Sequence, residues 1–249
     1  MYDIENYYNA STIEEAVRLL KEHPDTRVIS GGSDVLIKIR EGKMAGTSLV
    51  SIRDIKELNG ITKKENGDIY IGAGTTFSHI TNDPVIQENI PVLGEAVDQV
   101  GGPQIRNIGT IGGNICNGAV SADSAPTVFS LNALLRIEDG NNGRTVPVRD
   151  FYLGPGRVDL KRGEILTHVI IPAKEYQGYH GNYIKYSMRK AMDIATLSCS
   201  VVSKVNTEKN ILEDVRITFG VAAPVPFRCE KTEAALKGQE ISEKLYEMT

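Results

Sequence analysis

Short apolar runs alternate with polar turns along the chain, and this pattern predicts a protein of mixed helices and strands. Near the N-terminus, Ser11 is followed by Glu14 and Glu15, which predicts a capping box at the start of a helix. The helix is then expected to end at His23-Pro24. Its apolar face has helical spacing and consists of Ile13, Ala16, Val17, Leu19 and Leu20.

A second pattern follows this helix. The run RVISG predicts a strand that stops at Gly31-Gly32, and the polar pair Ser33-Asp34 leads into VLIKIR, which fits either a helix or a strand. A phosphate-binding loop needs this order, because glycines free the backbone and Ser33 adds a hydroxyl donor. Gly-Gly-Ser-Asp is also ordinary turn chemistry, so the segment alone leaves both interpretations open.

The middle of the chain predicts further strands and helices. Residues 48–61 indicate a strand and a short helical turn, and KKENGD then separates two runs that form a predicted hairpin. Residues 75–101 predict two amphipathic helices with Pro84 and Pro91 near their starts. Residues 127–139 predict a buried helix that continues into a strand. After a boundary in AKEYQGYHG, three strand-like runs predict a three-stranded antiparallel sheet, followed by a polar helix.

The stretch from Gly101 to Pro126 has an unusual composition, with six glycines, three asparagines and few large side chains. We expect a loop in which Gly112 and Gly113, flanked by Thr110 and Asn114, direct several N–H groups into one concavity. A side chain at Gly112 would then fill the space that a phosphate needs. The alternative is an irregular loop that is packed tightly against a sheet.

Composition narrows the class of protein. The 249 residues fit one to two domains, or one domain of several lobes, and 41% hydrophobic with 24% charged residues is typical of globular proteins. A net charge of −4 with mixed signs gives no basis for a nucleic-acid or anionic-membrane surface. We find no apolar run of membrane-spanning length and no signal peptide, and therefore expect a soluble cytoplasmic protein.

Metal-site and dinucleotide motifs are also missing from the sequence. The three cysteines and four histidines are scattered without ligand spacing, which argues against a disulfide framework, a zinc site or a self-contained iron–sulfur cluster. In GAGTTF, Phe77 stands where a dinucleotide fingerprint has its third glycine, and no βαβ unit precedes it. We therefore reject a Rossmann fold at this position.

With both glycine stretches placed, the chain resembles the FAD-binding (medium) subunit of the molybdenum hydroxylase family, and most of all the xanthine dehydrogenase type. The most specific feature is T-I-G-G-N with Asp123 nine residues after Asn114. The similar segments span nearly the whole chain in the family's order: VISGGSDVLIKIR, GGPQIRNIGTIGGNICNGAVSADSAP, GPGRVDLKRGEIL, KYSMRKAMDIATLSCS and FGVAAPVPFRC.

The resemblance implies an α+β protein with a two-lobed FAD-binding fold of the vanillyl-alcohol-oxidase/PCMH type over residues 1–173, with lobes of about 1–55 and 56–173. Residues 180–249 would form a C-terminal domain of the CO-dehydrogenase flavoprotein type, an α/β lobe with the three-stranded antiparallel sheet. Family members usually continue with a further helical segment. We therefore expect this domain to be shortened, or its last helices to come from a partner.

The resemblance also implies which residues hold FAD. Val28 to Val35 would form the first pyrophosphate loop and Thr110 to Asn114 the second, while Leu166 and Lys185 would line the flavin. The complete implied set is Val28, Ile29, Ser30, Gly31, Gly32, Ser33, Asp34, Val35, Gly101, Thr110, Ile111, Gly112, Gly113, Asn114, Asp123, Leu166 and Lys185.

Physical chemistry agrees with these roles while leaving alternatives for single residues. Backbone N–H groups suit a pyrophosphate where few cations are spare. Asp123 would be repelled by phosphate unless it accepts bonds from ribose hydroxyls; the alternative is an Asx-turn cap. Lys185 can stabilise charge at the N1–C2=O end of reduced flavin, or it is a solvated lysine on a strand. Arg106 is expected to pair within the protein, and Cys116 to be a small buried residue.

The implied function is that of an electron-transfer subunit, active only with partners. Substrate would be oxidised on a molybdopterin-binding large subunit, electrons would cross the [2Fe–2S] clusters of a small subunit, and NAD⁺ would accept them as hydride from this chain's FAD. We expect a dimerised heterotrimer. The substrate stays open between xanthine, nicotinate, aldehydes and carbon monoxide. Two other functions compete: a stand-alone flavoprotein oxidase or reductase of the same fold, and a scaffold without flavin, against which the two glycine loops argue.

Overall fold

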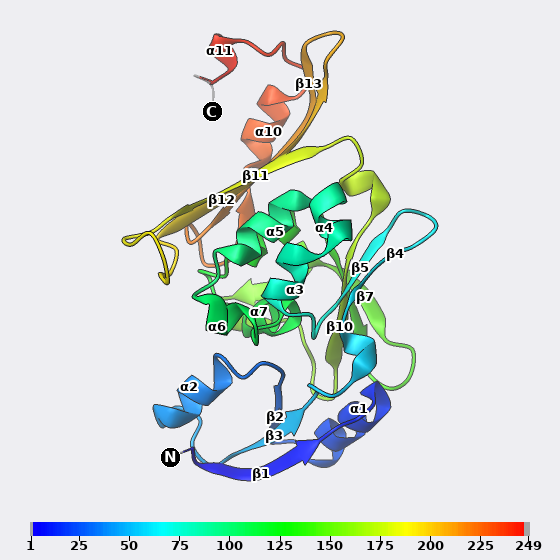
Figure 1. Cartoon of the computed structure of the whole chain (residues 1–249), viewed down its shortest axis with the longest axis vertical. Coiled ribbons are helices and arrows are strands. Elements are labelled where there is room, and N and C mark those ends of the chain that lie inside the picture. The colour runs from blue at the N-terminus through cyan, green and yellow to red at the C-terminus, as the bar shows by residue number, and fades with distance from the viewer. Residues whose placement is uncertain (1, 247–249) are drawn as a thin grey trace.

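Three β-sheets, each with its own helices, follow one another along the long axis of the molecule (Figure 1). The structure is a computed structural model, and it describes residues 2–246. We call the three parts the first, second and third lobes, in chain order. The predicted shortening of the C-terminal domain concerns the chain end, where residues 247–249 lie outside the described residues.

The first lobe is a parallel sheet of order β1-β3-β2 with a helix in each crossover, as parallel strands require. The predicted capping box lies one residue later than expected, because Thr12 is the cap and accepts the N–H of Glu15 at 3.1 Å. VLIKIR is a helix, which settles that alternative. The elements are β1 (Ile4–Asn9), α1 (Ile13–Glu22), β2 (Thr26–Ile29), α2 (Val35–Arg40), β3 (Thr47–Ser51) and the 3₁₀ turn η1 (Lys56–Leu58).

The second lobe is built on an antiparallel sheet of order β4-β5-β10-β6-β7, in which the predicted β4–β5 hairpin is confirmed. A small ribbon, β8 with β9, lies beside it. Its strands are β4 (Ile61–Lys63), β5 (Ile69–Gly72), β6 (Leu134–Glu138), β7 (Arg144–Pro147), β8 (Tyr152–Gly154), β9 (Arg157–Val158) and β10 (Ile165–Ile171).

The helices of the second lobe correct two predictions. Residues 77–98 form three helices rather than two, because Thr76 and Asp83 each cap a new helix, while Pro84 and Pro91 do begin helices as predicted. The glycine-rich stretch is largely helical rather than a loop. The helices are α3 (Phe77–Asn82), α4 (Pro84–Asn89), α5 (Pro91–Asp98), α6 (Pro103–Arg106), α7 (Ile111–Asn117), α8 (Ser124–Ser130) and α9 (Val148–Phe151).

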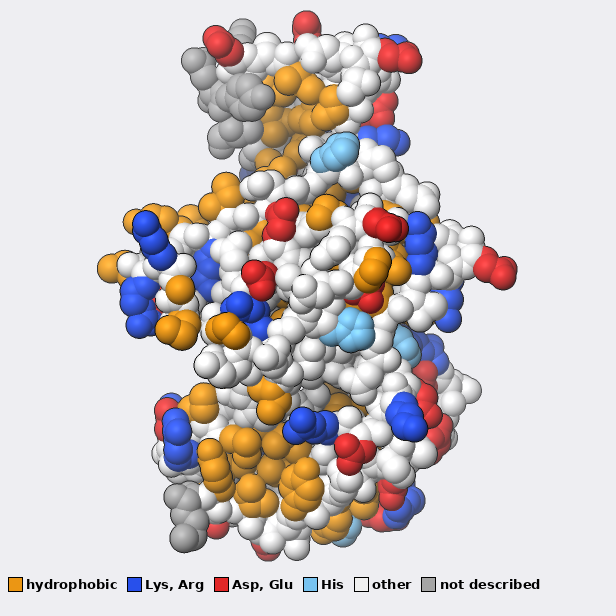
Figure 2. Space-filling model, in the orientation of Figure 1, with side chains coloured by type: hydrophobic (Ala, Val, Ile, Leu, Met, Phe, Trp, Pro, Cys, Tyr) orange, Lys and Arg blue, Asp and Glu red, His pale blue; other side chains and the backbone are white. Residues whose placement is uncertain are grey.

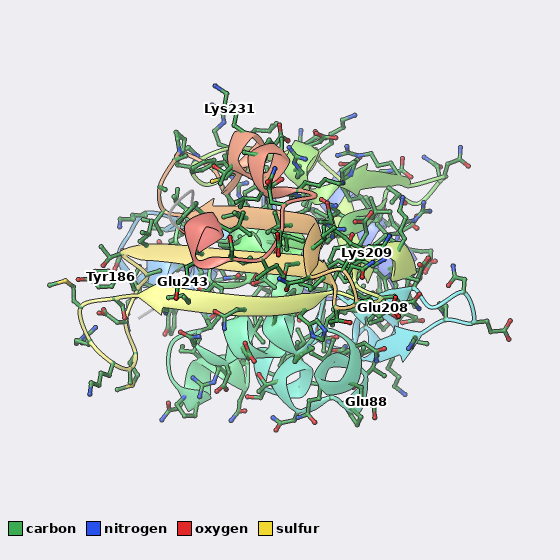
Figure 3. The ribbon with its side chains drawn as sticks, turned by 90° about the horizontal axis from the view of Figure 1, so that it is seen from above. Glu88, Tyr186, Glu208, Lys209, Lys231 and Glu243 are labelled. Carbon is green, nitrogen blue, oxygen red and sulfur yellow. The ribbon has the colours of Figure 1, made fainter. Side chains whose placement is uncertain are left out.

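The third lobe is an antiparallel sheet of order β11-β12-β13-β14, so a fourth strand of two residues joins the three predicted ones. Seen from above, these strands cross the helices of the second lobe, with Tyr186 at one end of the sheet and Glu208 and Lys209 at the other (Figure 3). The elements are η2 (Ala173–Glu175), β11 (His180–Tyr186), β12 (Leu197–Asn206), β13 (Ile211–Gly220), β14 (Phe227–Arg228), α10 (Glu230–Leu236) and α11 (Glu243–Tyr246).

The second and third lobes share one hydrophobic core. Tyr183 and Val202 of the third-lobe sheet belong to the same buried cluster as the sheet and helices of the second lobe. Polar contacts reinforce this junction at Arg216, which is only 5% exposed and donates to the carbonyl of Ser130 and to both the carbonyl and the carboxylate of Glu175. Its guanidinium also lies over the ring of Tyr179, 4.3 Å from the centroid.

Arg216→Met is expected to lower the free energy of unfolding by about 3–5 kcal/mol, because it removes the buried guanidinium that pairs with the half-buried Glu175 carboxylate and donates to two carbonyls. Arg149→Met removes an arginine that pairs with Glu230 at the exposed surface, and should cost less than about 1 kcal/mol. Urea-induced unfolding of the two variants measures the difference. Equal losses would show that the Arg216 cluster does not hold the lobes together.

Candidate cofactor site

The turn between β2 and α2 presents a row of free backbone donors. Among the described residues, no hydrogen bond is donated by the N–H groups of Gly31 to Val35, and Asp34 provides no side-chain cap. Gly32 has a φ of +75°, a conformation that favours glycine. Consecutive free N–H groups around such a residue form a concavity that binds anions. The turn therefore has the donors that the sequence predicted for a phosphate.

The second glycine turn differs from the prediction, because it is the first turn of α7 and its donors are already used. Thr110 caps the helix, and its side-chain oxygen and carbonyl accept the N–H groups of Gly113 and Asn114 at 3.2 and 3.0 Å. The N–H groups of Ile111 and Gly112 donate to the carbonyls of Thr75 and Ala73. The expectation that these four N–H groups surround a phosphate is therefore corrected, and any contact of this turn with a cofactor stays a prediction.

Two glycines of these turns are explained by packing within the protein. A Cβ on Gly112 would lie 2.5 Å from the Cβ of Ala73, and one on Gly31 would lie 1.9 Å from the carbonyl oxygen of Ile108. The prediction that a side chain at Gly112 would fill a phosphate site is thus wrong, because it would meet Ala73 in the turn that follows β5. Gly113 is exposed, and a Cβ there would meet only the Thr110 hydroxyl, at 3.0 Å.

The two glycine turns touch each other across the boundary between the first and second lobes. The Thr110 hydroxyl donates to the Ser30 hydroxyl at 3.1 Å, and Lys38 of α2 donates to the side-chain oxygen of Asn117 at 2.9 Å. On the first-lobe side, Figure 2 shows apolar side chains gathered on the surface below the boundary, and Ile37 of α2 is an exposed apolar residue of this lobe. The free N–H groups thus lie beside a fixed lobe contact.

Asp123 lies at the start of α8 and connects the second lobe to the third. Its side chain makes no cap, so the Asx-turn alternative is excluded. Instead it accepts bonds from the Tyr183 hydroxyl at 2.8 Å and from the Lys185 ammonium at 2.9 Å. Lys185 also donates to the carbonyl of Gln99 at 2.9 Å, and its side chain is only 6% exposed, which excludes a solvated lysine.

Burial dominates the electrostatics of this group. Desolvation raises the pKa of Asp123 above its ordinary value, although Lys185 and Tyr183 both oppose the shift. Burial and the Asp123 charge raise the pKa of Tyr183, so its hydroxyl stays protonated. Burial also raises the pKa of the Cys116 thiol to about 12, as expected for an inert buried cysteine.

The remaining predicted residues are placed less directly. Leu166 lies on β10, is 3% exposed and belongs to the core of the second lobe, so its contact with a flavin stays a prediction. Gly101 has a φ of +50°, and its carbonyl accepts a hydrogen bond from Arg106. Arg106 also pairs with Asp98, which confirms the prediction that it pairs within the protein. Val28 and Ile29 lie on β2, where Ile29 is buried and Val28 half-buried.

Sequence reasoning missed two polar residues of this region. Tyr183 was not singled out, although it stands two residues before Lys185 in a predicted strand, and residues two apart share a face. That spacing was the available signal. Lys38, which bridges the lobes to Asn117, gave none, because a lysine in VLIKIR is equally typical of a solvated face.

Comparison with known proteins identifies the chain. Residues 2–174 match the family model described as FAD binding domain in molybdopterin dehydrogenase, and residues 182–249 match the CO dehydrogenase flavoprotein C-terminal domain. The chain belongs to this family. FAD is therefore its cofactor, and the free donors of Gly31 to Val35 fit the pyrophosphate of such a group.

Known members of the family are similar over most of their length. The chain is 40% identical to the putative xanthine dehydrogenase FAD-binding subunit XdhB of Escherichia coli, covering 94% of this chain and 79% of that one. It is 32% identical to the nicotinate dehydrogenase FAD-subunit of Eubacterium barkeri, covering 100% and 84%. A solved carbon monoxide dehydrogenase from Hydrogenophaga pseudoflava superposes with a TM-score of 0.93 at 30% identity, covering 100% and 85%.

Two searches of the described residues found nothing to add to the site. No group of three or more His, Cys, Asp or Glu side chains in residues 2–246 is arranged to hold a metal ion. Within the same part of the chain, no helix is long and apolar enough to cross a membrane.

Two neighbouring glycines of this FAD-binding domain should respond differently to the same substitution. Gly113→Val places a side chain at an exposed position whose one close neighbour is the Thr110 hydroxyl, and is expected to weaken FAD binding about tenfold or more with a smaller loss of stability than Gly112→Val. Gly112→Val overpacks the contact with Ala73 and is expected to cost about 1–3 kcal/mol of stability. FAD titration and urea unfolding measure the two effects. Undiminished FAD affinity in Gly113→Val would remove the α7 turn from the site.

Proposed function

We propose that this chain is the FAD-carrying electron-transfer subunit of a molybdenum-containing hydroxylase of the xanthine dehydrogenase type. Electrons from substrate oxidised on a molybdopterin-binding large subunit would arrive through the [2Fe–2S] clusters of a small subunit and leave as hydride to NAD⁺. The observation that carries the proposal is the row of free N–H groups from Gly31 to Val35, placed beside the contact between two lobes of a FAD-binding domain.

The cysteines support placing the clusters on another subunit. An iron–sulfur cluster of this kind takes four thiolates, and the chain has three cysteines, on or beside α7, β12 and α10. Burial raises the pKa of Cys116 to about 12 and that of Cys199 to about 11, which disfavours the thiolates that metals bind. All three are free thiols, which suits the reducing cytoplasm, the location that we propose.

Xanthine is the substrate that the 40% identity to XdhB of Escherichia coli favours, and purine metabolism is then the setting. Relatives with other substrates in their names, including nicotinate, carbon monoxide and glyceraldehyde, are 29–32% identical to this chain. Substrate choice would lie on the molybdopterin subunit. Whatever the substrate, this chain would perform the same task, which is to hold FAD where electrons enter and leave.

The chain's own residues would perform that task by binding and orientation. The N–H groups of Gly31 to Val35 would hold the pyrophosphate, and Asp123 has lone pairs left on both carboxylate oxygens for ribose hydroxyls. Lys185 has one further N–H for the flavin end. When bound, FAD supplies the exchange between one-electron and two-electron chemistry. Leu166 and the buried core around it exclude water from the second-lobe side.

Purification with and without partners tests the proposal. The native chain is expected to carry the visible absorption of flavin and to co-purify with a molybdopterin subunit and a [2Fe–2S] subunit, identified by mass spectrometry. Xanthine-dependent reduction of NAD⁺ is expected from the complex and not from the chain alone. If the chain alone oxidises a small substrate, it is a stand-alone flavoprotein. If it binds no flavin, the cofactor assignment fails.

A further inference from the structure

The carboxylate of Asp123 is fixed by two side chains of a single strand in another lobe. Tyr183 and Lys185 are two residues apart on β11, so both point from the same face of the sheet towards α8. Each donates to a different oxygen: the tyrosine hydroxyl to Oδ1 at 2.8 Å and the ammonium to Oδ2 at 2.9 Å. Asp123 is 6% exposed, so no large part of this carboxylate is left to water.

The two donors differ in what holds them in place. The ring of Tyr183 is 5% exposed and is part of the core shared by the second and third lobes, so its hydroxyl is anchored by packing. The ammonium of Lys185 is shared between Asp123 and the Gln99 carbonyl, and its side chain is 6% exposed. A change at Lys185 would therefore leave Tyr183 as the donor that still fixes Asp123.

We propose that Tyr183 is a positioning residue for the cofactor, because its hydroxyl holds the Asp123 carboxylate in the orientation that accepts the ribose hydroxyls. Since Tyr183 stays bonded to Asp123, Lys185 can donate to bound FAD without leaving Asp123 unpaired. This inference rests on the proposed function. Tyr183 acts through Asp123 and has no contact with the cofactor of its own. A buried carboxylate that loses one of its two donors would either rotate or take up a proton more readily.

The charges around Asp123 set the sign of the pH effect. Among the described residues, the titratable groups that contact Asp123 are Lys185 and Tyr183 on β11. The other polar groups nearby are neutral: the Gln99 carbonyl at the end of α5, and the hydrogen bond between Ser124 and Asn114 of α7. The Tyr183 hydroxyl lowers the pKa of Asp123, so its removal raises that pKa. The loss of FAD affinity on acidification would then begin at a higher pH.

Tyr183→Phe in the full chain tests the role, because phenylalanine keeps the buried ring and removes only the hydroxyl. Tyr179→Phe is the matched control: it removes a tyrosine–aspartate bond of 2.9 Å, to Asp214, at the same junction of lobes. FAD affinity is followed by flavin fluorescence over a pH series, and melting temperature is measured in parallel. We expect Tyr183→Phe to bind FAD about tenfold more weakly, and its acid limb, the fall in FAD affinity on acidification, to begin at a higher pH. The FAD affinity of Tyr179→Phe is expected to stay within about twofold of wild type.

The double variant with Asp123→Asn separates positioning from packing. In the Asp123→Asn background, Tyr183→Phe is expected to change FAD affinity by less than about twofold, because the group on which it acts has gone. Asp123→Asn alone should bind FAD weakly and show no fall in affinity on acidification. This single variant serves as the test if Tyr183→Phe does not fold. Wild-type affinity and pH profile in Tyr183→Phe, or an acid limb in Asp123→Asn, would overturn the positioning role alone. A wild-type chain that binds no FAD would overturn the proposed function with it.

Discussion

The direct contact between the first and second lobes is the constraint on which the site depends. Gly31 packs so closely against the carbonyl of Ile108 that a Cβ would lie 1.9 Å from that oxygen, and the hydroxyls of Ser30 and Thr110 are hydrogen-bonded beside it. Within residues 2–246, the N–H groups of the β2–α2 turn beside this contact donate no hydrogen bond. The turn keeps its donors free because its position is determined by packing rather than by backbone pairing.

The same contact gives the two glycine-rich stretches different tasks. In the first, Gly32 adopts a positive φ and the backbone faces outward with unused donors. In the second, Gly112 lets α7 lie against Ala73, in the turn that follows β5, and the N–H groups of the α7 turn bond within the protein itself. Glycine thus leaves backbone donors free in one turn and allows close approach of neighbouring backbone in the other, so two similar motifs differ in what they offer a ligand.

Sequence reasoning predicted the elements well where local rules determine them. Pro84 and Pro91 begin helices, the polar turn after Lys63 joins a hairpin, and the three long third-lobe strands pair as expected. It was wrong where the determining partner is distant in the chain. The N–H groups of Ile111 and Gly112 donate to Thr75 and Ala73, about forty residues earlier, and no local pattern reports such a partner. For the site, glycine content alone could not distinguish packing from binding.

The buried pair of Asp123 and Lys185 is difficult to explain by stability. Both side chains are 7% exposed or less, and an ion pair taken out of water gains little, since apolar residues of similar size are often as stable or more so. Burial still raises the pKa of Asp123 although the ammonium lies 2.9 Å away. A charged pair retained at such a cost, between the FAD-binding domain and the C-terminal domain, is better explained by a partner that arrives later: ribose hydroxyls for Asp123, and a developing negative charge for Lys185.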